Sequence, residues 1–262
     1  MTTPSPSSKS VSFGVTNAIF IGRSIRLSLR NTEALIMAIM LPVMLMLLFT
    51  YVFGGAIDSS GNYVNYVVPG IILLCAGFGS SSTAVDVAQD MTNGIIDRFR
   101  TMPISSLSVI TGHVAASLAR NLIATGVVIS VALLVGFRPS AGALEWLGAL
   151  AVIILFILTF TWLFAAIGLV TGSPSAAAGY GFILLFLPYL SSAFVPTDTM
   201  PGWLQGFANN QPITPVIETI RGLLTGTPID GSVWPAIGWC LIILLVSLVW
   251  CVLAFRGKAG RR

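Results

Sequence analysis

The sequence predicts an all-α integral membrane protein with six transmembrane helices, and three observations support this fold class. Apolar residues make up 55% of the chain and charged residues only 8%, whereas soluble domains carry roughly 25% charged residues. The chain contains several uncharged apolar stretches, and their lengths approach or exceed the roughly 20 residues needed to cross a bilayer. Most of the few lysines and arginines flank these stretches, as they do in the loops of membrane proteins.

The first 32 residues precede the apolar stretches and divide into two parts. Residues 1–12 are rich in Ser, Thr and Pro, which is typical of a disordered tail. Residues 13–32 are expected to form an amphipathic helix on the inner leaflet of the membrane. Arg23, Arg26 and Arg30 form a stripe beside its apolar face, where they would meet anionic lipid headgroups. Contact with a soluble partner is an alternative interpretation of the same stripe.

Six apolar segments follow, and we interpret them as membrane spans. They cover about 35–53, 67–88, 117–137, 147–170, 176–195 and 233–255. The first contains Pro42, where a kink is expected, and the fifth contains Pro188. A short basic segment, 257–262, follows the last span.

The second span carries polar residues in its second half. Four consecutive hydroxyl side chains, Ser80, Ser81, Ser82 and Thr83, are followed by Asp86 near the membrane edge. Hydroxyl groups are rarely turned to lipid in a run of this kind, so another helix or a water-filled cavity is expected opposite them. Asp86 is expected to line a path or to pair with a basic group of a partner helix.

The distribution of positive charge predicts the orientation of the chain. With both termini in the cytoplasm, ten of the thirteen lysines and arginines lie on the cytoplasmic side. Arg138 and Arg221 then lie outside, and Arg120 lies within the third span. This asymmetry agrees with the positive-inside rule. It also places the loop 89–106, between the second and third spans, in the cytoplasm.

The segment 86–106, DVAQDMTNGIIDRFRTMPISS, is the longest charged interruption between two apolar spans. Within it, a short amphipathic helix ending at Pro103 is expected. One arc of that helix carries Ile95, Ile96, Phe99 and Met102, and the remainder carries Asp97, Arg98 and Arg100. Such a helix offers a surface on which a soluble motor protein can act.

The segment 196–232 on the outer side contains two apolar pieces that are too short to span a membrane. We expect two short helices that dip into the outer leaflet and return, with a surface lid as the simpler alternative. Thr214 is expected to cap the second helix, with Pro215 at its first position. Glu218 and Arg221 are three residues apart on that helix and are expected to pair.

Several classes of chemistry are excluded or disfavoured. Neither lysine, Lys9 or Lys258, stands in a phosphate-binding GxxxxGK motif, so the chain is not expected to hydrolyse ATP. His113 is the only histidine, and no acidic cluster suggests a metal site. No lysine- and arginine-rich cluster with interleaved aromatic residues indicates nucleic-acid binding. Arg120 has two interpretations, a substrate counter-ion or, as we expect, a side chain that extends to the headgroups.

The four aromatic residues of the fifth span allow two interpretations. These residues are Tyr180, Phe182, Phe186 and Tyr189. They suit contact with an apolar substrate, but they suit lipid contact or packing at least as well. We expect the more ordinary role for most of them and retain the substrate role as an alternative.

Two stretches of the chain resemble the membrane subunit of type-2 ABC exporters, in particular the daunorubicin-resistance-like permeases. The first is GIIDRFRTMPISSLSVITGH at 94–113, which is similar to the cytoplasmic coupling segment of that family. The second is MPGWLQGFANNQPITPVIETIRGLL at 200–224, which resembles the extracellular re-entrant helices before the last span. The resemblance extends over essentially the whole chain, including an amphipathic helix before six spans.

This resemblance implies an export permease that is not itself an enzyme. A cytoplasmic P-loop ATPase in two copies would bind ATP and Mg²⁺, and two permeases would form a homodimer or a heterodimer. Helix 13–32 and loop 86–106 would receive the motion of the ATPase. The second and fifth spans would line the path, and the extracellular helices carrying Glu218 and Arg221 would close it. The substrate implied is a drug or antibiotic, with lipid or polysaccharide export as the alternative.

Overall fold

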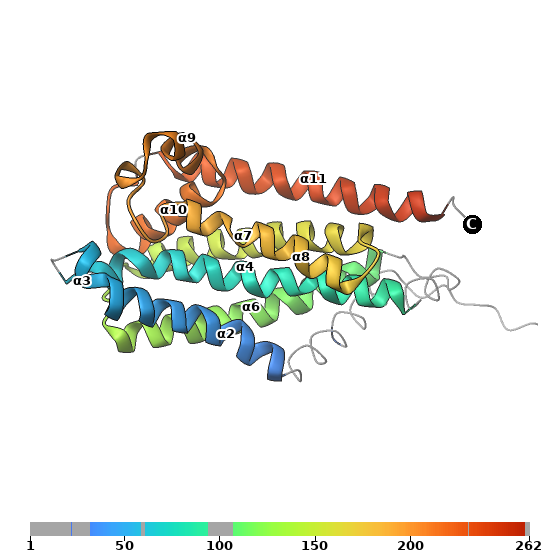
Figure 1. Cartoon of the computed structure of the whole chain (residues 1–262), viewed down its shortest axis with the longest axis horizontal. Coiled ribbons are helices and arrows are strands. Elements are labelled where there is room, and N and C mark those ends of the chain that lie inside the picture. Colours follow the sequence, from blue (N-terminus) through green and yellow to red (C-terminus); the bar gives the residue numbers. More distant parts are fainter. Residues whose placement is uncertain (1–21, 23–31, 59–60, 94–106, 230, 260–262) are drawn as a thin grey trace, which may run out of the picture.

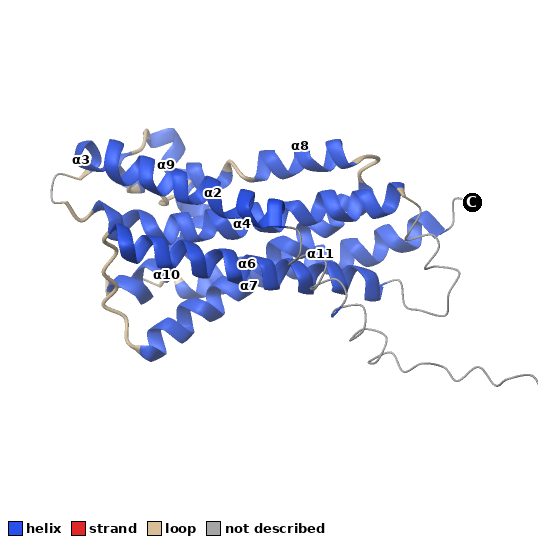
Figure 2. Cartoon of the chain, turned by 90° about the horizontal axis from the view of Figure 1, so that it is seen from below, coloured by secondary structure: helices blue, strands red, loops and turns tan. Residues whose placement is uncertain are grey.

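The computed structural model describes residues 22, 32–58, 61–93, 107–229 and 231–259, which form helices and loops only (Figure 2). Five helices in this part of the chain are long and apolar enough to cross a membrane. They are α2 (Thr32–Leu47), which continues through the π-helical η1 (Leu48–Phe53) and α3 (Gly54–Ile57), then α4 (Tyr63–Thr92), α6 (Leu107–Val135), α7 (Ala143–Val170) and α11 (Val233–Ala259).

The centre of the bundle is α4, which packs against α2, α6 and α7 as well as against the shorter helices described below. In its most apolar stretch 72% of the residues are buried, compared with 22% in α11. Small residues allow the close packing of α4. At Gly168 of α7, an added Cβ atom would lie 2.4 Å from the carbonyl oxygen of Ala84 on α4. The two backbones therefore meet directly, as small residues permit between membrane helices.

The predicted fifth span, 176–195, is a shorter helix than expected. Its helix α8 (Pro174–Leu184) begins where the Ser173 hydroxyl accepts a hydrogen bond from the Ala176 amide at 3.2 Å. It ends before η2 (Leu187–Leu190), a 3₁₀ turn that contains Pro188, because proline lacks an amide donor and its ring crowds the preceding turn. The apolar stretch Pro174–Leu190 is too short to be counted with the five long helices, and it lies at the margin of the bundle (Figure 2).

Two short helices occupy the predicted outer segment 196–232, after the 3₁₀ turn η3 (Thr197–Thr199). They are α9 (Gly202–Asn210) and α10 (Ile213–Thr225), and α10 is largely buried against α4, α7 and α11. The expectation that Thr214 caps α10 and that Pro215 is its first residue is wrong. The helix already begins at Ile213, and the Thr214 hydroxyl donates a hydrogen bond to the carbonyl of Ala208 at 2.5 Å.

The two ends of the bundle differ in what they carry. Helices α3, α9 and α10 lie at one end, and the C-terminal end of α11 lies at the other (Figure 1). We call these the outer end and the inner end, after the sides that the distribution of positive charge predicts for them. Helix α4 reaches Thr92 at the inner end, so the beginning of the predicted loop 86–106 is helical.

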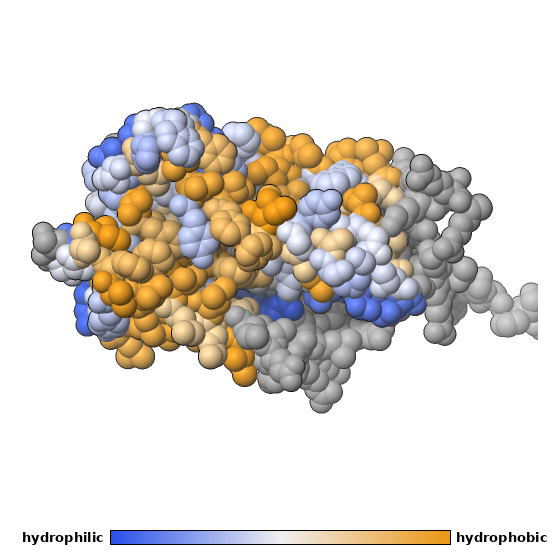
Figure 3. All heavy atoms as spheres, in the orientation of Figure 1, coloured by the Kyte–Doolittle hydropathy of each residue, from blue (hydrophilic) through white to orange (hydrophobic). Residues whose placement is uncertain are grey.

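The lateral surface of the bundle is apolar. Many large hydrophobic side chains are exposed along it, including Leu134, Leu245 and Val246. Figure 3 shows apolar residues over much of one face, with hydrophilic residues gathered around α9. A soluble protein rarely exposes an apolar surface of this extent. Together with the five long helices, this surface defines a multi-pass membrane protein.

Candidate functional site

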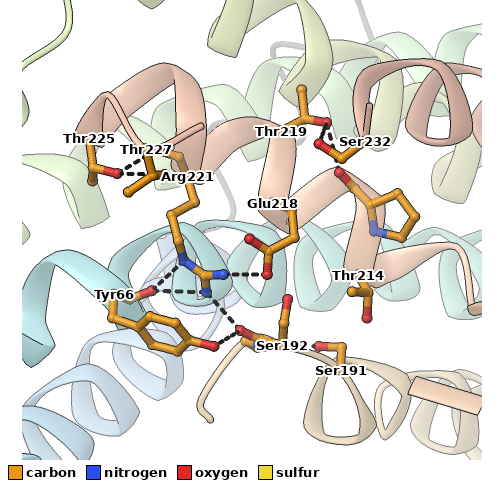
Figure 4. Close-up of polar contacts among 12 residues, drawn as sticks. Tyr66, Ser191, Ser192, Thr214, Glu218, Thr219, Arg221, Thr225, Thr227 and Ser232 are labelled. Atoms are coloured by element: carbon orange, nitrogen blue, oxygen red, sulfur yellow. Dashed lines mark hydrogen bonds and ion pairs between the residues drawn. The ribbon is translucent and has the colours of Figure 1, made fainter. Parts of the chain in front are cut away.

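Arg221 is the central residue of a polar cluster at the outer end (Figure 4). It lies on α10 and is only 5% exposed. Its Nη1 atom lies 2.5 Å from Oε1 of Glu218, so the ion pair expected from their spacing is confirmed. Arg221 is buried because the face of α10 that carries it packs against α4. The Glu218 side chain remains 39% exposed.

The Arg221 guanidinium also binds two main-chain carbonyl oxygens. Nε and Nη2 donate to the carbonyl of Tyr66 on α4 at 3.2 and 3.1 Å, and Nη2 donates to the carbonyl of Ser192 at 2.7 Å. The guanidinium carbon lies 3.8 Å from the centre of the Tyr66 ring, within the range of a cation–π contact. One side chain therefore joins α10, α4 and the turn that follows η2.

Three further side chains hold this region together. The Tyr66 hydroxyl donates to the carbonyl of Ser192 at 3.0 Å, and the Tyr63 hydroxyl donates to the carbonyl of Phe194 at 2.7 Å. Gln211, just before α10, donates from Nε2 to two carbonyls of η2, at 2.9 and 3.1 Å. We refer to Tyr63, Tyr66, Gln211 and Arg221 as the outer clamp.

A glycine on α4 makes the outer clamp possible. At Gly70, an added Cβ atom would lie 2.7 Å from the Cβ atom of Ala193 and 2.8 Å from its carbonyl oxygen. The turn following η2 therefore rests directly on the backbone of α4. Because this turn belongs to no regular element, its carbonyl groups take their hydrogen bonds from the outer clamp.

A second polar cluster lies toward the inner end, between α4 and α6, and is centred on Arg120. We refer to Asp86, Asp90, His113 and Arg120 as the inner cluster. Nη2 of Arg120 donates to the carbonyl of Gly79 at 3.2 Å and to the hydroxyl of Ser82. Nη1 of Arg120 lies 3.9 Å from Oδ2 of Asp86, and Nε2 of His113 lies 2.9 Å from Oδ2 of Asp90.

The burial of Arg120 corrects one expectation. This side chain is only 5% exposed, so it does not extend along the surface to the headgroups. It turns into the bundle because α4 presents a carbonyl and a hydroxyl at Gly79 and Ser82. Asp86 stands at the rim of the cluster, with half of its side chain exposed. Asp86 and Arg120 approach one another, which agrees with the expectation that Asp86 pairs with a basic group of another helix.

The hydroxyl run on α4 faces other helices. Ser80 is fully buried, and its oxygen accepts hydrogen bonds from Thr161 on α7 at 3.2 Å and from Asn121 on α6 at 3.4 Å. Ser81 and Ser82 donate to carbonyls of their own helix, both at 2.8 Å. Thr83 is also buried. Ser80 therefore joins three helices of one chain, and a role for the run in lining a path stays a prediction.

The aromatic side chains of the predicted fifth span lie on the surface. Tyr180, Phe182 and Phe186 are each more than half exposed, and Tyr189 is 36% exposed. Helix α8 itself packs on the hydroxyl run, since a Cβ atom added at Gly181 would lie 3.4 Å from the Cβ atom of Ser81. The aromatic and hydroxyl residues therefore sit on neighbouring helices without sharing one buried site.

Two groups of predicted residues lie outside the described part of the chain. One is the coupling group Ile95, Ile96, Asp97, Arg98, Phe99, Arg100, Met102 and Pro103. The other is the arginine stripe Arg23, Arg26 and Arg30. Their roles stay predictions.

Sequence reasoning overlooked most of the outer clamp and one residue of the core. Tyr63 and Tyr66 stand three residues apart at the start of α4, and Asn121 is a fully buried amide in an apolar helix. For Asn121 the available signal was a polar side chain within an apolar segment, because such a group needs partners in the bundle. Tyr63 and Tyr66 bind main-chain carbonyls, and the sequence does not indicate which carbonyls these are.

The fold and these clusters define a multi-pass helical membrane protein whose polar residues join its helices. No group of three or more His, Cys, Asp and Glu residues within the described ranges is arranged to hold a metal ion. The chain belongs to the ABC-2 type transporter family, whose sequence profile matches residues 17–225. It is therefore the non-catalytic permease subunit of an ABC transporter, a family whose permeases act with an ATPase subunit.

Two similar proteins carry names that refer to drug resistance. The daunorubicin resistance ABC transporter permease DrrB1 of Streptomyces coeruleorubidus is 33% identical over 195 residues, which are 74% of this chain and 69% of that protein. A protein of Mycobacterium tuberculosis, named as a probable doxorubicin resistance ABC transporter permease, DrrC, is 26% identical over 231 residues, 87% of this chain and 83% of its own length.

Proposed function

We propose that this chain is the permease of an exporter that moves a hydrophobic or amphipathic molecule, of the drug or antibiotic class, out of the cell. The observation that carries the proposal is the likeness over most of the chain to permeases named for daunorubicin and doxorubicin resistance. The apolar lateral surface supports it, because a substrate of this class partitions into the bilayer beside the protein.

The energy for export comes from a separate P-loop ATPase in two copies, which binds ATP and Mg²⁺. Both lysines of this chain lack the sequence context of a nucleotide-binding loop, which supports an external energy source. Two permeases form the transport unit, as a homodimer or a heterodimer. Helix 13–32 and loop 89–106 receive the motion of the ATPase.

In the proposed topology both termini are cytoplasmic and the chain crosses the cell membrane six times. The inner end faces the cytoplasm, and the distribution of lysine and arginine supports this orientation. Helix α8 with η2 makes the fifth crossing, where local thinning of the bilayer compensates for its short length. Helices α9 and α10 enter the outer leaflet and return.

The outer clamp, together with the ion pair of Arg221 and Glu218, closes the extracellular end in this proposal. Its hydrogen bonds tie α10 and the turn after η2 to α4. These elements must move together or separate when the path opens. Separation breaks the hydrogen bonds from the guanidinium to these carbonyls, so the clamp favours the closed state.

Reconstitution of the permease with its ATPase in inside-out vesicles tests the export function. ATP addition is expected to drive daunorubicin into the vesicles, measured by its own fluorescence, while a non-hydrolysable ATP analogue supports no accumulation. A fluorescent phospholipid in the same vesicles reports lipid export. ATP-dependent movement of the phospholipid without movement of daunorubicin would contradict the assignment to drug export.

Charge reversal in the cytoplasmic loop tests the coupling role. The triple variant Asp97→Lys, Arg98→Glu and Arg100→Glu is expected to lose co-purification with the ATPase, because the rim charges of the contact change sign. Arg138→Glu provides a control, since Arg138 lies in the exposed loop at the outer end. If the triple variant assembles and transports normally, coupling must lie elsewhere, with helix 13–32 as the next candidate.

A further inference from the structure

A groove lies at the inner end between the last turn of α7, the start of α8 and the facing side of α11. Its volume is about 440 Å³. Ligand pockets in proteins measure roughly 300–1,000 Å³, so this groove can hold a molecule of drug size. It lies apart from both the outer clamp and the inner cluster, and neither contributes a residue to it.

The chemistry of the groove favours an apolar, aromatic occupant. Ile167, Val170 and Ala176 give it aliphatic walls, and two aromatic rings, Tyr180 from α8 and Trp250 from α11, line it from different helices. No charged side chain is among the lining residues that the structure describes. An ionic group would therefore be costly inside it, whereas a flat ring system gains contact with two aromatic rings.

The position of the groove indicates where the occupant comes from. The surface at the groove is apolar: Val170, which lines it, and Val249 and Leu253, on the same helix as Trp250, are each about half exposed or more. Figure 1 shows the start of α8 and the second half of α11 toward the end of the bundle that bears the C-terminus. In the proposed topology the groove therefore opens sideways to the inner leaflet of the bilayer.

We infer that this groove binds the aromatic body of the exported amphiphile and receives it from the inner leaflet before transport. The inference rests on the proposed export function and assigns a site to its substrate. A polar or charged part of the same molecule remains outside, at the headgroup level. The groove rim offers the Thr171 hydroxyl, which itself donates to the carbonyl of Gly168 at 3.2 Å.

Two glycines provide a matched steric experiment. Gly172 lines the groove, and a Cβ atom added there meets no atom within 4 Å. Gly172→Leu therefore fills the groove while leaving the neighbouring packing intact. Gly179, on α8, also offers open space and lies outside the groove, so Gly179→Leu is its control.

Two tryptophans of α11 provide a second pair. Trp250 lines the groove and is 38% exposed, and Trp239 is 39% exposed outside it. Trp250→Ala removes one aromatic wall, and Trp239→Ala removes a ring of equal exposure elsewhere on the same helix. The measurement is the Kd for daunorubicin, by fluorescence anisotropy of the compound, with the full-length permease and its ATPase in lipid nanodiscs.

Gly172→Leu and Trp250→Ala are expected to raise the Kd about fivefold or more, and both controls are expected to stay within about twofold of the wild type. If the wild type binds daunorubicin and both groove variants bind it equally well, the inference is overturned. Vesicle flux separates the two proposals. Normal flux with unchanged binding in the variants rejects the groove alone, whereas a wild type without binding or flux rejects the export function and the groove with it.

Discussion

Arg120 and Arg221 are both buried, and both use main-chain carbonyl oxygens as acceptors. Each also has a carboxylate partner that is at least one-third exposed, Asp86 or Glu218. An ion pair with an exposed member is screened by water and contributes little, whereas a hydrogen bond from a buried cation to a carbonyl contributes more. The carbonyl acceptors, and not the acids, are therefore the principal partners of these arginines.

For Arg221, replacement by methionine is expected to lower the free energy of unfolding by about 2–4 kcal/mol, because three hydrogen bonds to carbonyls and a cation–π contact are lost. Unfolding by sodium dodecyl sulfate in mixed micelles measures this change. Arg138→Met is the control, since Arg138 is exposed and its side chain donates only to carbonyls near it in sequence. Equal losses of unfolding free energy in the Arg221 and Arg138 variants would show that the outer clamp does not stabilise the protein.

The geometry of the inner cluster predicts which partner of Arg120 contributes most to stability. Arg120→Met is expected to cost about 2–3 kcal/mol, whereas Asp86→Asn is expected to cost less than about 1 kcal/mol. The Asp86 carboxylate lies 3.9 Å from the guanidinium and is half exposed, so its attraction is weak. The same micelle titration compares the two variants. A larger effect at Asp86 would show that the ion pair dominates after all.

Helices α4 and α7 illustrate how elements of this protein pack. Their backbones approach at Gly168, and buried hydroxyls join them where Thr161 donates to Ser80. In a bilayer, apolar side chains gain little by leaving lipid, so close approach and hydrogen bonding supply most of the association. Helix α8 differs from α4 and α7. Regular helix ends early near Pro188, and the turn that follows is held by side chains of the outer clamp.

A methyl group at the α4–α7 contact tests this account. Gly168→Ala places a Cβ atom 2.4 Å from the carbonyl oxygen of Ala84, so the helices must separate. The expected loss of stability is about 1–3 kcal/mol, the range for overpacking a core. Gly126→Ala on α6, where an added Cβ atom meets nothing within 4 Å, should leave the melting temperature unchanged or slightly raised. A Gly168→Ala variant as stable as the wild type would show that α4 and α7 can shift apart without loss of stability.

The orientation of the whole molecule can be tested with single cysteines, because the native Cys75, Cys240 and Cys251 are buried and should react little. Asn209→Cys at the outer end is expected to react with a membrane-impermeant maleimide added to intact cells. Ser175→Cys at the inner end is expected to react only after the cells are made permeable. The reverse pattern would invert the proposed topology.

The pattern of apolar residues was sufficient to predict five of the six membrane segments, the two short outer helices and the pairing of Glu218 with Arg221. These features depend on the local order of residues, and helix periodicity and bilayer thickness translate that order directly into structure. The fifth segment was predicted too long because the effect of Pro188 depends on what packs around it. The 3₁₀ turn and the residues after it are stabilised by hydrogen bonds from the outer clamp, whose members come from other parts of the chain.

The residue order alone thus established a helical membrane protein, with its apolar segments and its asymmetry of positive charge. The burial of Arg120, the outer clamp and the groove beside Trp250 emerged only from the way the helices pack. Each of them depends on main-chain carbonyls or on the space between helices. Every residue carries the same carbonyl group, so no residue type indicates which of these groups will meet a distant side chain. That pairing follows from the three-dimensional arrangement of α4 and its neighbours.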